Sequence, residues 1–144
     1  MLGKKLVKNL RYYLDPYFTV PVYTFDQNVT RELPCIVVGF KSETSSFSGN
    51  YGHYTVSGSI QVMNQGYEDS DNNISDSLAE QITNCLLNES GLLSAVNVPI
   101  SGTDTRPASA FHLNALFIRS EDRVDEGTST VIDISFDAFC AGKN

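Results

Sequence analysis

The sequence lacks any apolar run long enough to cross a membrane. A spanning helix needs about 20 consecutive apolar residues, so we expect no membrane association. A secretory signal is also missing. Residues 1–16 begin with cations, as a signal peptide does, but Lys8 and Arg11 then interrupt the apolar positions. We therefore expect no export.

Cysteine is scarce, and occurs only as Cys35, Cys85 and Cys140. The number is odd, the spacings are long and no Cys-x-x-Cys pair occurs, which argues against a disulfide framework. All three cysteines lie in apolar patterns. They are predicted to be buried free thiols in a protein that works in a reducing compartment.

Residue patterns that carry catalysis or bind metals are nearly absent. His53 and His112 have no Cys, Asp or Glu at ligand spacing, whereas a zinc site needs three or four ligands. No Gly-x-Ser-x-Gly elbow and no glycine-rich phosphate loop occurs. Residues 69–80 place oxygen-bearing side chains at the spacings of a calcium loop, but Ile74 stands where that loop requires glycine. We therefore expect no metal, no cofactor and no enzymatic activity.

Positive charge is rare outside the N-terminal segment, and the net charge is −7. Residues 1–41 contain six cations against three carboxylates, whereas residues 42–144 contain four against 14. A body this acidic repels a nucleic-acid backbone, so its general surface is not predicted to wrap DNA or RNA. The basic N-terminal segment is the one candidate cationic patch.

Two segments have the periodicity of an amphipathic helix. The first covers residues 2–14 and ends before Pro16, because the residue before a proline avoids the α region. Its apolar face is formed by Leu2, Leu6, Leu10 and Tyr13. Its opposite face carries Lys4, Lys8 and Arg11. The second predicted helix covers residues 74–87.

Five segments have the composition or the alternation of β-strands. They are residues 20–26, 35–40, 53–63, 110–119 and 130–140. Pro21 predicts an edge position for the first, because proline has no amide to donate. In the last strand, Ile132, Ile134, Phe136 and Ala138 should face inward. Asp133, Ser135 and Asp137 should face outward.

Polar stretches separate these segments. Residues 41–52 are predicted to form a long mobile loop, residues 92–109 an apolar tether and an exposed loop, and residues 120–129 a charged hairpin connection. Because most successive strands are joined by hairpins, the sheet should be mainly antiparallel. We thus predict a single α+β domain over residues 1–144, with about five strands, an N-terminal helix and one central helix. The predicted order is α-β-β-β-α-β-β.

This order, with a basic N-terminal helix and the final hairpin FHLNALFIRSEDRVDEGTSTVIDISF, resembles the tail terminator, or tail completion, family of tailed bacteriophages. The resemblance implies a structural virion protein of the tail or neck that assembles in the host cytoplasm. It implies a hexameric ring that caps the tail tube, ends tube growth and offers a surface to the neck or head connector. DNA would pass through the ring without specific binding, and no catalytic residues are implied.

In such a ring, several side chains are candidates for contacts. The candidates for subunit or partner contacts are Lys4, Lys8, Arg11, Phe47 and Tyr51. The acidic side of the last strand, with Asp133 and Asp137, is the candidate inner wall, since like charge keeps a passing duplex from adhering. The competing interpretation is that these charged faces are only solvated.

Two other classes of protein fit the same sequence. One is a different neck or tail protein, such as a head–tail joining protein or a tube subunit. The other is a small cofactor-free enzyme or ligand-binding α+β domain, which requires a concave pocket with converging polar groups.

Overall fold

The structure, a computed structural model, describes residues 2–48, 51–65, 74–97, 111–126 and 129–143. Its elements in chain order are α1 (Leu2–Leu14), the 3-10 turn η1 (Asp15–Tyr17), β1 (Val22–Thr24), β2 (Cys35–Ser48), β3 (Tyr51–Asn64), α3 (Ile74–Leu87), α4 (Glu89–Asn97), β4 (Phe111–Glu126) and β5 (Ser129–Lys143). Both predicted helices have the predicted bounds.

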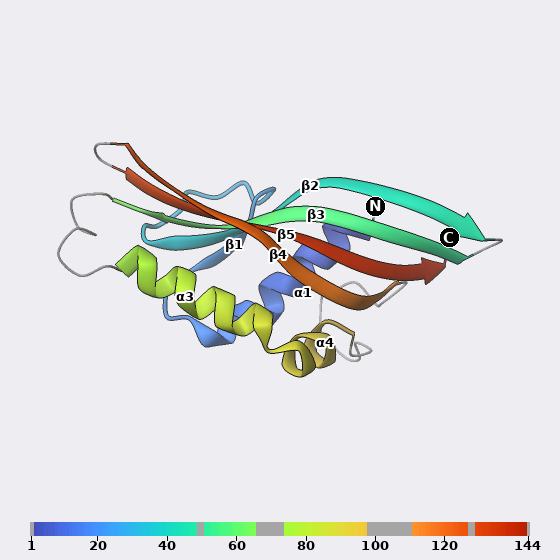
Figure 1. Cartoon of the computed structure of the whole chain (residues 1–144). Helices are drawn as coiled ribbons and strands as arrows, with labels where there is room; N and C mark the ends of the chain where they lie inside the picture. The colour runs from blue at the N-terminus through green and yellow to red at the C-terminus, as the bar shows by residue number, and fades with distance from the viewer. Residues whose placement is uncertain (1, 49–50, 66–73, 98–110, 127–128, 144) are drawn as a thin grey trace.

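The five strands form one twisted sheet in the order β1-β2-β3-β5-β4. β1 runs parallel to β2, and the other neighbours are antiparallel. The three helices of the described residues lie on one face of this sheet, and its other face has no helix over it (Figure 1). The predicted α+β class with a mainly antiparallel sheet is therefore confirmed, and β1 lies at an edge as Pro21 indicated.

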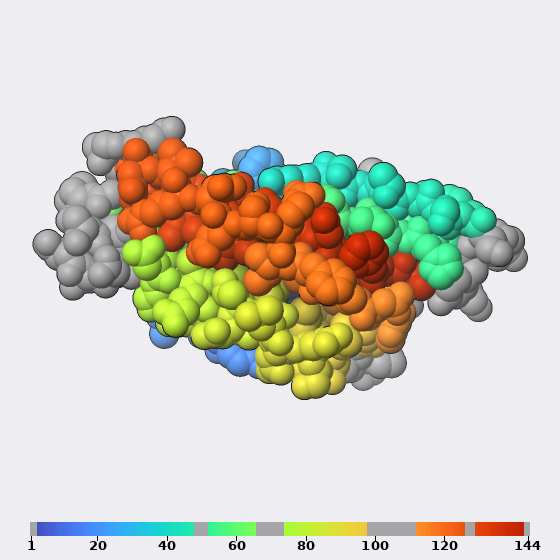
Figure 2. All heavy atoms as spheres, viewed as in Figure 1, coloured from blue at the N-terminus to red at the C-terminus, as the bar shows by residue number. Residues whose placement is uncertain are grey.

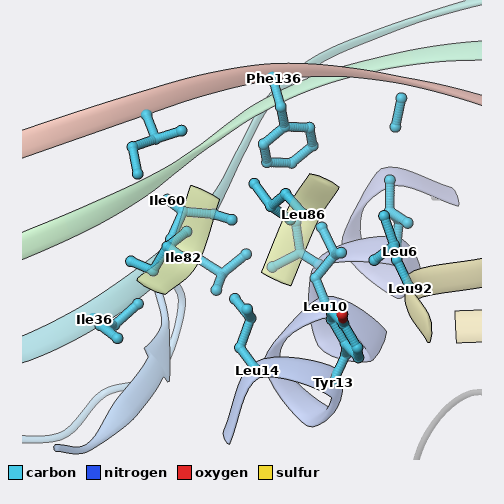
Figure 3. Packing of buried hydrophobic residues seen from close by; sticks show 14 of the residues in the cluster. Leu6, Leu10, Tyr13, Leu14, Ile36, Ile60, Ile82, Leu86, Leu92 and Phe136 are labelled. Atoms are coloured by element: carbon cyan, nitrogen blue, oxygen red, sulfur yellow. The ribbon is translucent and has the colours of Figure 1, made fainter. Parts of the chain in front are cut away.

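The core lies between the sheet and the helix layer. β3 and β5 turn alternate side chains toward it, and Phe136 points from β5 toward the helices (Figure 3). From α1, Leu6 and Leu10 are completely buried and Tyr13 nearly so. The predicted inward residues of the last strand are all buried. Their alternation in the sequence predicted the core face of the sheet correctly.

Hydrogen bonds join α1 to α3, α4 and β2. The Tyr13 hydroxyl donates to the Cys85 carbonyl of α3 at 2.7 Å, and the Asn9 amide donates to the Val96 carbonyl of α4 at 3.3 Å. The Gly3 amide, one of the unpaired donors at the helix N-terminus, donates to a Glu43 carboxylate oxygen at 2.7 Å. The basic helix is thus held in one orientation on the sheet.

The predicted loop over residues 41–52 is wrong. β2 continues to Ser48 and pairs with β3 up to Ser48 opposite Tyr51, so the two strands form a long arm. The segment is rich in Ser and Thr and buries little on either side, so it lacks the apolar alternation by which a strand is recognised. A register shift between Phe40 and Ser42 also breaks its period.

The predicted hairpin connection over residues 120–129 joins antiparallel strands as expected, but it is too long. β4 continues to Glu126 and β5 begins at Ser129, with Val124 opposite Val131. Register shifts between Leu113 and Ala115, and between Ile118 and Ser120, interrupt the alternation of β4. The sequence at the charged end of β4 therefore lacks the alternation by which a strand is recognised.

The tether predicted from residue 92 is instead part of the helix α4. Leu92 and Val96, one turn apart, are buried in the core. The Asn88 side chain accepts a hydrogen bond from the Gly91 amide at 3.4 Å, as an N-cap does. Gly91 lies inside this helix. The rest of that prediction, residues 98–109, lies outside the described residues.

Candidate functional site

The uncovered face of the sheet is polar at its centre and aromatic near β4. Ser59 and Ser135 lie at the centre and are each 6% exposed. Phe117 of β4 and Phe139 of β5 form an edge-to-face pair with ring centroids 5.7 Å apart. These two rings are 59% and 41% exposed. Such a pair buries much apolar area when a partner covers it.

Asp133 and Asp137 lie on this uncovered face, as the alternation of β5 predicted. The Asp137 carboxylate accepts hydrogen bonds from the Ser57 hydroxyl at 2.6 Å and from Arg119 Nη1 at 3.2 Å. Asp133 Oδ2 lies 3.9 Å from Lys41 Nζ. Each carboxylate therefore has a cation beside it, and the face is less acidic than the sequence suggested. Their place on an inner wall stays a prediction.

The three predicted cations of α1 line a groove beside the first strand. Lys4 borders a hollow of about 220 Å³, and Lys8 and Arg11 border a second of about 380 Å³. Asp26 lines both hollows, which joins them into one surface that we name the basic groove. The apolar residues of the groove are Val7, Phe25, Val38 and Phe40.

The cations of the basic groove are not equivalent. Lys4 and Lys8 are exposed, and no carboxylate of the described residues forms an ion pair with either. Arg11 is half-buried and its Nε donates to the Val22 carbonyl at 2.7 Å. Arg11 therefore also holds α1 against β1, which the sequence did not indicate.

A second charged surface, of opposite sign, lies where α3 meets the far end of β4. Arg123 of β4 binds Asp76 of α3 and Asp125 of its own strand. Figure 2 shows α3 directly against β4 on this side of the molecule. We name this surface the acidic end. Its exposed carboxylates are Asp76, Glu80, Glu121, Asp122 and Asp125.

The two aromatic candidates lie at the tip of the arm. Phe47 is 53% exposed, and its ring meets that of Tyr54 edge to face at 5.8 Å. Tyr51 begins β3 opposite Ser48. The arm projects beyond the helix layer (Figure 1), so its tip is accessible to a neighbour. A contact role for Phe47 and Tyr51 stays a prediction.

The buried titratable groups are structural. Burial, and secondarily the Glu43 carboxylate, raises the pKa of Cys140 to about 12. Burial also raises the pKa of the Tyr13 hydroxyl to about 12. The three cysteines are free thiols, two buried and Cys85 half-buried. A thiol with a raised pKa is a poor nucleophile at neutral pH.

Groups that could hold a metal ion are absent from the described part of the chain, where no three His, Cys, Asp or Glu side chains converge. Residues 69–73 of the calcium-like segment 69–80 lie outside the described residues, and residues 74–80 belong to α3. Among the described residues, no helix combines the length and the apolar character needed to span a membrane.

Comparison with known proteins gives a structural likeness. No protein-family model matches the sequence, and no curated protein is found to be similar. Among solved structures, the chain is similar to one in the virion of a native gene transfer agent particle. The TM-score is 0.57 at 17% identity, and the likeness covers 98% of this chain and 95% of the other. At this identity it establishes a shared fold.

Sequence reasoning missed the Phe117–Phe139 pair and the contribution of Asp76 to the acidic end. Six of the eight residues in FHLNALFI are apolar, which indicates a strand with apolar side chains on both faces. Since the helices cover one face of the sheet (Figure 1), this composition could have indicated apolar side chains on the other face. The approach of Asp76 to Arg123 depends on the packing of α3 against β4, which no local pattern contains.

Proposed function

We propose that this chain is a structural, non-enzymatic protein of a phage-like virion, located in its tail or neck. The observation that carries the proposal is the fold shared with a chain of a gene transfer agent virion over nearly the full length of both.

Within that class, we propose the tail terminator role. Six copies would form a ring on the last ring of the tail tube and end its growth. The other side of the ring would meet neck or connector proteins. DNA would pass through the centre without specific binding, and assembly would take place in the host cytoplasm.

The surfaces of the molecule support assembly. A closed ring requires two different, complementary surfaces on each subunit, related by a rotation. This chain carries a basic groove along α1 and an acidic end at α3 and β4. It also has an uncovered sheet face with an exposed aromatic pair. Stable protein interfaces bury about 800 Å² on each partner, for which a sheet face offers enough area.

A tube-growth assay tests the terminator role. Adding the purified chain to polymerising tail tube protein of the same virion should give shorter tubes, with the added chain at one end only. Native mass spectrometry should show a six-copy assembly. Incorporation along the whole tube would identify a tube subunit instead, and a monomer with no effect on tubes would favour a ligand-binding domain.

A further inference from the structure

The two charged surfaces differ in sign and belong to different parts of the molecule. Charge is segregated along the chain, since residues 42–105 contain no Lys or Arg. The cations of α1 are thus separated in the sequence from the carboxylates of α3. As folded, the chain presents a cationic surface beside β1 and an anionic surface at the far end of β4.

The net charges of the two surfaces are opposite in sign. The basic groove has three cations and the single carboxylate of Asp26, which gives a net charge of +2. The acidic end has five described carboxylates and Arg123, which gives −4. Opposite potentials of this kind steer encounter and fix the register of a contact.

Apolar side chains on both surfaces fit the same contact. Phe25 borders the basic groove and is 66% exposed. Val124, which lies with Asp122 on the uncovered side of β4, is 49% exposed. An exposed apolar residue surrounded by charge is typical of the interface pattern of an apolar centre within a polar rim.

We propose that the basic groove of one copy receives the acidic end of the next copy. This inference rests on the proposed ring, because it assigns the contact that closes the ring. The contact is heterologous, so each subunit uses both surfaces and neither remains free in a closed ring. The exposed Lys4 and Lys8 then gain carboxylate partners, which no described residue of their own subunit supplies.

Charge reversal in trans tests the contact. The first variant carries Lys4→Glu and Lys8→Glu, which changes the groove from +2 to −2. The second carries Glu80→Lys, Glu121→Lys and Asp122→Lys, which changes the acidic end from −4 to +2. Each variant alone sets like charges against each other and should lose ring formation, with association at least about tenfold weaker. A 1:1 mixture should restore rings, because every contact in an alternating ring again joins opposite charges.

Matched controls separate this contact from a general effect of charge. Lys5→Glu alters a half-exposed cation one turn from Asn9, on the α4 side of α1. Glu89→Lys alters an exposed carboxylate on α4, outside the acidic end. Both should assemble as the wild type does. All variants should fold, since exposed charges contribute little to stability. Circular dichroism checks this, and Lys→Gln and Glu→Gln versions replace any variant that is unfolded.

The possible outcomes are distinct. Rings from the mixture but from neither variant alone would support the contact. Rings from either variant alone, or none from the mixture, would overturn it and leave the proposed ring intact. A wild-type protein that stays monomeric would overturn the contact together with the ring.

Discussion

At the scale of single residues, a close packing constraint lies at Gly58, where β3 crosses the core. A Cβ added there would lie 2.5 Å from the Gly39 carbonyl oxygen and 2.8 Å from the Phe136 ring. Backbone and a fully buried ring cannot both move aside, so the position requires glycine.

The variant Gly58→Ala should therefore lower the free energy of unfolding by about 1–3 kcal/mol, as overpacking does. Gly39→Ala is the matched control, because its Cβ would have no neighbour closer than 3.6 Å. Urea unfolding of both variants measures the difference. Equal midpoints would show that the strands are not packed as described.

Buried hydroxyl and thiol groups should make the protein sensitive to alkali. The pKa of Tyr13 is raised from 10.0, and that of Cys140 from 9.0, to about 12 in both cases. Above pH 9 the unfolded chain loses these protons while the folded chain keeps them, so stability falls as pH rises toward 12. Each group contributes at most about 1.4 kcal/mol per pH unit.

Thermal melts between pH 8 and 12, in steps of about one unit on this linkage argument, measure the slope. The variant Cys140→Ala should melt lower at neutral pH because a buried side chain is truncated, but its melting temperature should fall less steeply above pH 9. An unchanged slope would mean that the Cys140 thiol does not titrate as described.

At the scale of elements, the side chain of Asn97 fastens α4 to the edge strand β4. Its amide nitrogen donates to the Leu113 carbonyl at 2.9 Å, and its oxygen accepts from the Leu113 amide at 2.7 Å. The side chain thus pairs with the strand as another strand would, and it occupies part of an otherwise open edge.

Removing the two hydrogen bonds between the Asn97 side chain and Leu113 should loosen α4. Asn97→Ala leaves two backbone groups of Leu113 without partners and should cost about 1–3 kcal/mol. Asn97→Asp keeps the acceptor but sets a carboxylate against the Leu113 carbonyl, so it should also destabilise. The exposed Asn114 of the same strand is the control, and its alanine variant should be nearly neutral. Faster hydrogen exchange at the Leu113 amide in the Asn97 variants alone is the expected signature.

The arm of β2 and β3 gives a second prediction at this scale. β1 pairs with residues 36–38 of β2. Beyond them, no strand of the described residues pairs with the edge of β2 that faces away from β3. In the isolated subunit, alternate amides of residues 42–48 should be protected from hydrogen exchange and the others should exchange fast. Uniformly fast exchange would restore the mobile loop that the sequence indicated.

The elements that the sequence predicted are those with a buried face. Leu6 and Leu10 in α1, and Ile132 and Ile134 in β5, repeat at the spacing of their own secondary structure because one side of each element packs on the core. Residues 41–48 of β2 and the far end of β4 carry no such period, since most of their described side chains are exposed and bulges shift their register. The length of the strands therefore could not be predicted.

At the scale of the whole molecule, some features of the candidate surfaces could be predicted from the sequence and others could not. The cationic face of α1 follows from helical spacing and was predicted, apart from the bond from Arg11 to the Val22 carbonyl. The acidic end joins residues 76 and 123, which only the packing of α3 on β4 brings together. The cations beside Asp133 and Asp137 likewise come from neighbouring strands.

The inner wall of the ring gives a prediction at this scale. If the uncovered face lines the passage, replacing Asp133 and Asp137 by Asn should make assembled rings retain duplex DNA at low salt, where the wild type releases it. Asn keeps the shape of each side chain, and Glu89→Gln on α4 serves as the control for charge alone. A ring map in which these residues point outward, or into a subunit contact, would end this assignment without affecting the ring.

Electron microscopy of the purified chain shows whether it assembles into a ring. We expect discrete rings of six subunits around a central passage, with no growth into tubes as concentration rises. Particles that remain single subunits at every concentration, or that stack into continuous tubes, would contradict it.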